Sequence, residues 1–274
     1  FKKNQPDIDL PLFSIITVVY NNVSQIKRCM DSVFNQTYEN IEYIVIDGGS
    51  TDGTLDLIKE DEGKLDLWIS EKDDGIYDAI NKGINFSNGF TLMLHSDDQL
   101  YDKNTLERVS RCIKNQSTLY FGKVENYNEY VKWTYPNKSS EVDEEWFLKN
   151  MIPHQSSFIF ADIHKNHLFK DKKLSIGNDA LILGSIAQKY NALFMDIIIS
   201  KVELGGDSNN WKSLKRVYDY NNQTFIVNKK LGREMGIFQL IYQHVRGTIQ
   251  YVIFNYFGRK VFYKIFYRKF TKKN

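Results

Sequence analysis

The four residues His95-Ser96-Asp97-Asp98 follow an apolar run and place two carboxylates side by side. Adjacent carboxylates repel each other unless a cation lies between or near them. Hard divalent cations take oxygen ligands and bridge phosphates, so an ion held by Asp97 and Asp98 would neutralise a diphosphate leaving group. The other interpretation is a turn in which Asp98 caps the next helix, and the motif alone does not separate the two.

A second acidic stretch, DGGSTDGT at residues 47–54, combines two acids with three glycines. Glycine permits positive φ and a close approach of the backbone to a ligand. Asp47 can accept hydrogen bonds from a base or a ribose, and we favour ligand contact for it. For Asp52, capping of the following helix is an equally good interpretation, and Ser50 is a second candidate cap. The stretch is not GxGxxG, so it does not indicate a dinucleotide site.

A third cluster, Asp73 with Asp74, precedes Gly75 and a helical pattern. Within that pattern Asp78 and Lys82 are four residues apart and share one helix face. An ion pair between them is the simpler interpretation. The functional alternative brings Lys82 close to a phosphate.

The last candidates are Asn178-Asp179, preceded in the chain by His154-Gln155. A transfer that inverts an anomeric carbon needs a carboxylate that deprotonates the acceptor hydroxyl, and Asp179 at a helix start is a candidate. The alternative for Asp179 is again a helix N-cap. His154 by itself is more simply interpreted as a hydrogen-bonded structural residue.

The elements that must position these residues alternate along the chain. Continuous apolar runs predict strands at 13–20, 41–46, 67–70 and 90–94, and helical spacing predicts helices at 24–35, 54–59, 77–86, 105–113, 175–190 and 211–230. Such alternation predicts an α/β fold with a parallel sheet and right-handed crossovers. Ligands bind at the carboxyl ends of parallel strands, where the three acidic clusters fall. Residues 119–146 show weak strand patterns that fit an antiparallel extension.

Composition narrows the classes of protein further. The chain has 274 residues, 42% of them hydrophobic, and a net charge of +2, which excludes global disorder and gives no nucleic-acid signature. Cys29 and Cys112 form no metal-ligand spacing and no disulfide framework. We expect no signal peptide in the polar segment 1–11 and no membrane span, because the longest uncharged stretch, 247–258, is too short.

The C-terminal segment is basic and aromatic. No acid follows Glu234, whereas eight cations do: Arg246, Arg259, Lys260, Lys264, Arg268, Lys269, Lys272 and Lys273. Aromatic residues alternate with these cations, and Ile265 and Phe266 lie among them. We expect a helix that lies in the headgroup region of an anionic membrane. The alternative is a helical pair that packs on the catalytic domain.

Taken together, SIITVVYNN, IEYIVIDGGSTDGT, SEKDDGIYDAINKGI and LHSDD resemble the motifs of glycosyltransferase family 2, in that family's order and over roughly residues 12–190. The resemblance is closest to members that build bacterial O-antigen, capsule or exopolysaccharide. It implies the GT-A fold: a mostly parallel nucleotide-binding sheet flanked by helices, here with a C-terminal helical extension. We expect a catalytic domain at 1–205, with a nucleotide-sugar half at 12–100 and an acceptor half at 101–205, and the extension at 206–274.

The resemblance also implies roles for single residues. Thr17, Tyr20 and Asn21 would line the nucleotide pocket, and Asp47 would hold the base. Asp73, Asp74 and Lys82 would lie near the ribose and diphosphate, and Ser96 with Asp97 and Asp98 stands at the family's DxD-type motif, which binds Mn²⁺ or Mg²⁺. Asp179 matches the general base, and His154-Gln155 matches a recurrent pair in the substrate region. His95 stands where the motif's first acid is usual, so the metal depends on Asp97 and Asp98.

These expectations describe an inverting, metal-dependent enzyme that moves one hexose or N-acetylhexosamine from a UDP-sugar to a polyprenyl-diphosphate-linked sugar, on the cytoplasmic face of the plasma membrane. The chain lacks a QxxRW motif, so single addition is expected, and a homodimer is left open. A nucleotidyltransferase is the first alternative, although the segment YNNVSQIKR after the first strand has no glycine. A non-catalytic nucleotide-sugar-binding protein is the second.

Overall fold

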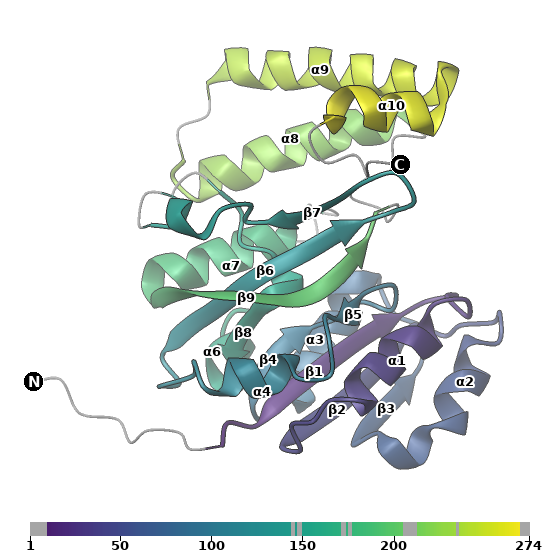
Figure 1. Cartoon of the computed structure of the whole chain (residues 1–274), viewed down its shortest axis with the longest axis vertical. Coiled ribbons are helices and arrows are strands. Elements are labelled where there is room, and N and C mark those ends of the chain that lie inside the picture. Colours follow the sequence, from purple (N-terminus) through teal and green to yellow (C-terminus); the bar gives the residue numbers. More distant parts are fainter. Residues whose placement is uncertain are drawn as a thin grey trace, which may run out of the picture.

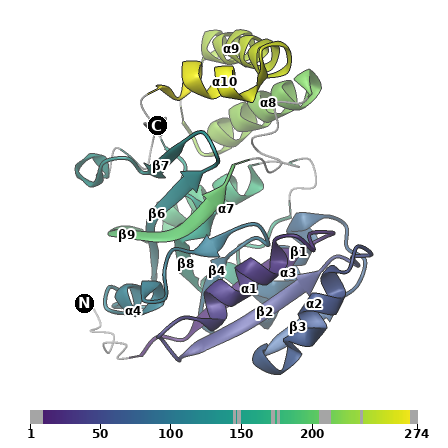
Figure 2. The same ribbon diagram turned by 45° about the vertical axis from the view of Figure 1, so that its right-hand side comes forward.

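A mixed sheet with helices on both faces forms the body of the molecule, and three further helices form a layer at one end of it (Figures 1 and 2). The computed structural model describes residues 10–143, 146, 150–170, 174, 177–204, 213–233 and 236–268. Over these residues the sheet has nine strands in the order β3-β2-β1-β4-β8-β6-β9-β5, and β7 pairs with β6.

The first four strands are parallel, as predicted. They are β1 (Phe13–Val19), β2 (Ile41–Asp47), β3 (Leu67–Ser70) and β4 (Phe90–Met93), joined by α1 (Ile26–Phe34), α2 (Thr54–Glu60) and α3 (Ile76–Phe86). Alternate residues of β1 face the two sides: Ile15 packs in the cluster under α1, and Ile16 packs under α3. A side chain at Gly83 of α3 would collide with Ile16, so glycine allows α3 to lie directly on the strand.

Beyond β4 the pairing is mixed. This part contains β5 (Gln99–Leu100), α4 (Thr105–Ser110), β6 (Thr118–Tyr127), β7 (Lys132–Tyr135), β8 (Ser157–Phe160), α6 (Ala161–Lys165), α7 (Asn178–Lys189) and β9 (Asn191–Glu203). β8 lies antiparallel between β4 and β6, and β6 runs parallel to β9. The hairpin of β6 and β7 confirms the predicted antiparallel extension. The short strand β5 pairs with β9 directly after the acidic turn, and it therefore ties that turn to the end of β9.

The C-terminal layer consists of α8 (Leu214–Lys230), α9 (Ile237–Tyr256) and α10 (Gly258–Phe266). Phe262 and Tyr263 of α10 are buried against Val131 beside the β6–β7 hairpin, so this helix packs on the sheet domain. None of the described helices has the length and apolarity needed to cross a bilayer. Of the predicted basic tail, Lys269, Lys272 and Lys273 lie outside the described residues, as does the start of the helix predicted from 211.

Candidate functional site

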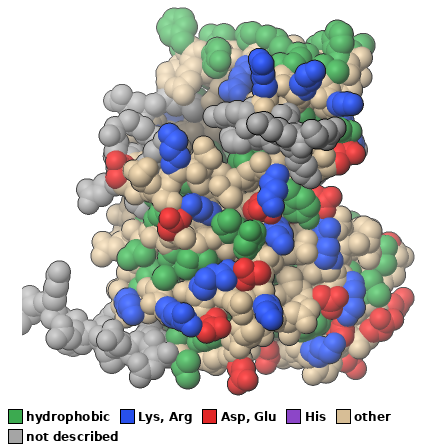
Figure 3. Space-filling model, viewed as in Figure 1, with side chains coloured by type: hydrophobic (Ala, Val, Ile, Leu, Met, Phe, Trp, Pro, Cys, Tyr) green, Lys and Arg blue, Asp and Glu red, His purple; other side chains and the backbone are tan. Residues whose placement is uncertain are grey.

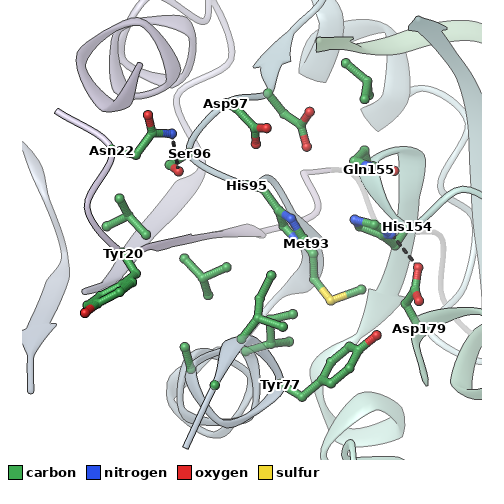
Figure 4. Close-up of a pocket in the computed structure, with 18 of the residues that line it drawn as sticks. Tyr20, Asn22, Tyr77, Met93, His95, Ser96, Asp97, His154, Gln155 and Asp179 are labelled. Atoms are coloured by element: carbon green, nitrogen blue, oxygen red, sulfur yellow. Dashed lines mark hydrogen bonds and ion pairs between the residues drawn. The ribbon is translucent and has the colours of Figure 1, made fainter. Parts of the chain in front are cut away.

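A cavity of about 560 Å³ opens at the carboxyl ends of β1 and β4 (Figure 4). It is walled by the loop after β1, the first turn of α3, the turn after β4, the 3-10 turn His154–Ser156, the start of α7 and the end of β9. The structure brings most of the predicted site residues together here: Tyr20, Asn21, Asp73, Ser96, Asp97, Asp98, His154, Gln155 and Asp179.

The acidic turn after β4 is held by the chain on both sides. The backbone N–H of Asp98 donates to the carbonyl of His95 at 2.9 Å, and the amide of Asn22 donates to the Ser96 hydroxyl at 2.9 Å. Ligand atoms of His95, Asp97 and Asp98 all lie within 4.8 Å of one another. Among the residues that the structure describes, no other three His, Cys, Asp or Glu side chains converge in this way.

The buried carboxylate of Asp98 is only partly satisfied by the protein. Asp98 is 2% exposed and accepts a hydrogen bond from Gln155, but its Oδ2 atom has no partner among the described residues. Burial raises the pKa of Asp98 well above its usual value, and the charge of Asp97 raises it further. Burial also raises the pKa of Asp97, and nearby Glu203 adds to the effect.

The neighbouring His95 is a neutral imidazole. Burial, followed by the proximity of His154, lowers the pKa of His95 to about 3, and its buried Nε2 atom has no described partner. A neutral imidazole and two carboxylates within one ion's reach fit a divalent cation such as Mn²⁺, because oxygen and nitrogen donors suit it and its charge relieves the repulsion between the acids. The residues present therefore fit the metal that the motif implies, with His95 added to the predicted pair.

His154 and Asp179 form a second polar pair across the cavity. The Nδ1 atom of His154 lies 2.7 Å from Oδ2 of Asp179, and the His154 ring packs 4.7 Å from the ring of His95, centroid to centroid (Figure 4). Burial raises the pKa of Asp179, but the hydrogen bond and the charge of His154 outweigh it, so the pKa lies below its usual value. Asp179 is thus an anion whose orientation is set by His154.

The start of α7 explains why Asp179 faces the cavity. Gly177, with φ +78°, is the N-cap of the helix, and no side chain caps it. The N-cap interpretation of Asp179 is therefore wrong, because Asp179 lies inside the first turn. The backbone N–H of Asn178 donates to the Tyr77 hydroxyl at 3.2 Å, and Tyr77 stacks on Phe169 at 5.1 Å, which ties the start of α7 to α3.

Two predicted residues of β1 and β2 lie outside the cavity. Thr17 is fully buried, and its hydroxyl contacts the Tyr43 hydroxyl at 3.1 Å and the Cys29 sulfur at 3.7 Å on the α1 side of the sheet. Asp47 is also fully buried, and its carboxylate accepts hydrogen bonds from the backbone N–H and hydroxyl of Ser50 and from the Ser70 hydroxyl. The predicted pocket role of Thr17 and base-holding role of Asp47 are corrected, because neither side chain reaches the cavity.

The remaining acids and Lys82 also have structural partners. Asp52 accepts from the Thr54 and Val23 backbone N–H groups at 3.0 Å each, which joins the start of α2 to the loop after β1. Lys82 pairs with Glu71 at 2.9 Å and with Asp78 at 3.2 Å, so the simpler interpretation of Lys82 is the observed one. Asp74 and Lys82 are not lining residues of the cavity, whereas Asp73 is.

Besides His95 and the apolar lining, sequence reasoning missed three polar residues of the cavity: Asn22, Tyr77 and Glu203. Asn22 and Tyr77 lie within the recognised motifs SIITVVYNN and SEKDDGIYDAINKGI, so their motif positions could have drawn attention to them. Glu203 ends β9, a strand that the sequence did not predict, and no local signal marks it. Its carboxylate pairs with Arg28 of α1 at 2.8 Å.

The fold and the site define a class: an α/β protein with an acidic turn that fits a divalent cation and a separate carboxylate in one cavity at the strand ends. The family model described as "Glycosyl transferase family 2" matches residues 14–176. This chain therefore belongs to glycosyl transferase family 2.

Curated relatives agree with that family. A PGL/p-HBAD biosynthesis glycosyltransferase of Mycobacterium bovis is 34% identical over 154 residues, covering 54% of this chain and 59% of that protein. Glycosyltransferase AglE of Haloferax volcanii is 29% identical over 177 residues, covering 63% of this chain and 54% of that protein. The matched region thus spans little more than half the length of these relatives.

Solved structures show the same GT-A fold at low sequence identity. TarS 1-349 of S. aureus in complex with UDP-GlcNAc has a TM-score of 0.61 at 17% identity, covering 93% of this chain and 76% of that one. Mannosyltransferase PcManGT from Pyrobaculum calidifontis, in complex with GDP-Man and Mn²⁺, has a TM-score of 0.58 at 17% identity, covering 90% and 73%. The predicted fold class is confirmed.

Proposed function

We propose that this protein is an inverting, metal-dependent glycosyltransferase that transfers a single hexose or N-acetylhexosamine from a UDP-sugar to a lipid-diphosphate-linked saccharide in bacterial surface polysaccharide synthesis. One observation carries the proposal: the acidic turn of Asp97 and Asp98, in which the buried Oδ2 of Asp98 has no described partner, shares a cavity with the anionic side chain of Asp179. The first group suits a diphosphate with its cation, and the second suits an acceptor hydroxyl.

The donor side of the cavity is built from the parallel half of the sheet. His95, Asp97 and Asp98 would hold Mn²⁺ or Mg²⁺, and a bound ion supplies charge neutralisation for a departing nucleoside diphosphate. Tyr20 is 65% exposed at the cavity and offers its ring face to a base. Asn21 fixes the loop that carries Tyr20, since its side chain accepts from the Thr51 backbone N–H at 2.8 Å. TarS and PcManGT are similar in fold and were solved with sugar nucleotides, which supports this assignment.

The acceptor side depends on Asp179. Its carboxylate takes the proton of the acceptor hydroxyl while that oxygen forms a bond to the anomeric carbon from the face opposite the leaving group. The bond from the anomeric carbon to the phosphate oxygen breaks, and the nucleoside diphosphate leaves with its electron pair. The lowered pKa keeps Asp179 deprotonated before the reaction, and His154 holds the carboxylate in place.

The domain assignment follows the same division. We assign residues 12–100 to the nucleotide-sugar half, about 101–205 to the acceptor half and 206–274 to a helical extension. We propose that the enzyme works at the inner face of the plasma membrane, where a lipid-linked acceptor and cytoplasmic UDP-sugars meet.

A donor screen with a synthetic lipid-diphosphate sugar tests the proposal, with NMR of the product to establish inversion. We expect transfer from one UDP-sugar and a loss of about 10²–10⁴-fold in turnover for Asp179→Asn, with UDP affinity unchanged. Asp162→Asn is the matched control, because Asp162 also lies in the first turn of a helix but is exposed on α6. Full activity of Asp179→Asn, or a product with retained configuration, would refute the mechanism.

The contribution of His154 can be separated from that of Asp179. His154→Phe keeps a ring beside His95 but removes the hydrogen bond to Asp179. We expect a turnover loss with little change in the KM for the donor, because the change acts on the base and not on nucleotide binding. A rise in donor KM at constant turnover would instead assign His154 to the donor.

A further inference from the structure

The outward face of α9 carries large apolar side chains that are exposed and not buried in the interior of the molecule. Large hydrophobic residues recur every three or four positions on one side of this helix, among them Phe238, Ile241, Val245, Ile249 and Tyr256, and each is at least half exposed. Phe238 is 84% exposed and Tyr256 is 78% exposed. Figure 3 shows hydrophobic side chains gathered along the rim of the molecule that α9 forms. We call this set the α9 stripe.

The inward face of α9 is polar and small instead. Gly247 and Gln250 are the buried residues of the helix, and a side chain at Gly247 would come within 2.6 Å of Val217 on α8. Thr248 hydrogen-bonds the Tyr218 hydroxyl at 2.9 Å. A helix that covers a protein core normally turns its apolar side inward. In α9, Ile253 and Phe254 do pack inward on the α10 cluster, but most of the large apolar side chains face outward. Such a stripe is a contact surface for something apolar outside this part of the chain.

The charge around the α9 stripe identifies the kind of surface. Five exposed cations accompany it: Arg246 on α9 itself, and Arg259, Lys260, Lys264 and Arg268 on α10 and the residues that follow it. No acid follows Glu234 in the sequence. In Figure 3 a row of basic side chains borders the hydrophobic rim. A second copy of this chain would bring like charges together, whereas an anionic bilayer neutralises them and accepts the apolar side chains.

We propose that the α9 stripe docks this protein on an anionic lipid surface, with α9 lying flat in the headgroup region and the exposed cations of α10 close to the same surface. The proposal assigns the apolar contact to α9 because Phe262 and Tyr263 of α10 are buried on the hairpin, with Tyr263 stacked on Tyr130 at 5.5 Å. The contact is made by α9, and α10 fastens the helical layer to the sheet domain.

The docking face connects directly to the acceptor side of the cavity, and this part of the inference rests on the proposed function. α9 packs on α8 at Gly247, and Val227 of α8 lies 3.6 Å from the position that a side chain would take at Gly177, the N-cap of the helix that carries Asp179. Only α8 therefore separates the lipid-facing helix from the helix that carries the proposed base. A saccharide on a lipid diphosphate would need to extend only past this layer.

Sedimentation of the full chain with vesicles tests the docking. We expect binding to phosphatidylcholine vesicles that contain phosphatidylglycerol and at least tenfold weaker binding to phosphatidylcholine alone. The double variant Phe238→Ser with Ile241→Ser should bind anionic vesicles at least tenfold less, with an unchanged melting temperature. The control is Phe86→Ser with Leu193→Ser, two hydrophobic residues that are 50% and 44% exposed on α3 and β9, and it should bind as the parent does.

Two results would overturn the docking. One is equal vesicle binding by the parent and the Phe238/Ile241 variant. The other is absence of vesicle binding by the parent together with a dimer, seen by light scattering, that this variant dissociates, which would assign the stripe to a second copy. Binding of UDP with Mn²⁺ is measured on the same proteins. If vesicles bind as expected but UDP does not, the proposed function fails while the docking stands.

Discussion

The ends of β2 and β4 both carry a buried aspartate, but the protein gives these two aspartates different hydrogen-bond partners. Each aspartate lies at or just beyond the carboxyl end of a parallel strand: Asp47, the last residue of β2, is 0% exposed, and Asp98, in the turn after β4, is 2% exposed. Asp47 is surrounded by donors from Ser50 and Ser70. Asp98 has a second carboxylate, Asp97, as its neighbour, and its Oδ2 atom has no described partner.

The difference teaches how a structural acid is told from a functional one. A buried carboxylate costs several kcal/mol of desolvation unless hydrogen bonds or a counter-charge compensate it. At Asp47 the chain supplies that compensation itself, and the acid holds two loops together. At Asp98 the protein's own compensation is incomplete, and under the proposed function a bound cation would complete it. Both aspartates lie at a strand end, so position does not separate a structural acid from a functional one. The hydrogen-bond partners of the carboxylate do.

Asp98→Asn is the substitution that we expect to have the largest effect, and it tests whether Asp98 is a functional acid. We expect transfer to fall by about 10³-fold, because the charge that a bound cation provides is worth several kcal/mol in the reaction. The melting temperature should stay the same or rise, since an unsatisfied buried charge is removed. Steady-state kinetics and a thermal melt measure both. A drop in melting temperature with activity intact would assign Asp98 to the framework.

The matching change at Asp47 should do the reverse. Asp47→Asn places an amide N–H₂ group toward the donors of Ser50 and Ser70, and we expect a loss of about 2–3 kcal/mol in the free energy of unfolding. Transfer by the folded fraction should stay within a few fold, because Asp47 does not line the cavity. Urea unfolding and kinetics on the same sample check this. If instead activity disappears while stability is kept, the two loops do not differ as described.

A buried histidine extends the comparison to pH. His164 is fully buried with its Nδ1 atom 2.7 Å from the Thr91 hydroxyl, and burial lowers its pKa to about 3. The unfolded chain binds a proton near pH ~6.5 and the folded chain does not, so stability is present above that pH and is lost as the pH falls below it. Between about pH 7 and pH 5.5, His164 should contribute a loss of about 1 kcal/mol.

His164→Asn, which keeps a polar group near Thr91 but does not titrate, should reduce that acid-dependent loss by about 1 kcal/mol. Urea unfolding at the two pH values gives the measurement, with His167→Asn as the control on a half-buried histidine three residues away. An identical pH dependence in the parent and in His164→Asn would show that this imidazole is protonated in the folded protein as well.

The smallest expected effect belongs to Lys82. It is satisfied by Glu71 and Asp78 on a partly exposed helix face, and surface ion pairs contribute little. Lys82→Ala should cost about 0.5 kcal/mol or less in unfolding free energy and change transfer less than threefold. A loss of a hundredfold in turnover would return Lys82 to the diphosphate and show that the ion pairs rearrange on binding.

The parallel half of the fold was predictable because strands buried on both faces form continuous apolar runs, as Phe13 to Val19 does. β8 and β9 were not predicted. β8 has four residues and follows a 3-10 turn, and the exposed residues of β9 do not alternate regularly with buried ones. Antiparallel insertion of β8 between β4 and β6 is a long-range pairing that no local pattern records.

The site was predictable where a residue's own segment places it, as for Asp97, Asp98 and Asp179. It was not predictable where contacts with distant segments determine the direction and the partners of a side chain. Thr17 points toward Tyr43 and Cys29, and Asp47 is occupied by Ser70 of the next strand. These partners are 12 to 26 residues apart in the sequence, and they come into contact only once the sheet has formed.

Calorimetric titration of UDP into the parent protein and into Asp98→Asn, each with Mn²⁺ and with EDTA, tests the central claim most directly. The incomplete compensation at Asp98 predicts that Mn²⁺ tightens UDP binding at least tenfold in the parent and has no such effect in Asp98→Asn. Equal UDP affinity in Mn²⁺ and in EDTA for the parent, or an unchanged Mn²⁺ effect in Asp98→Asn, would contradict it.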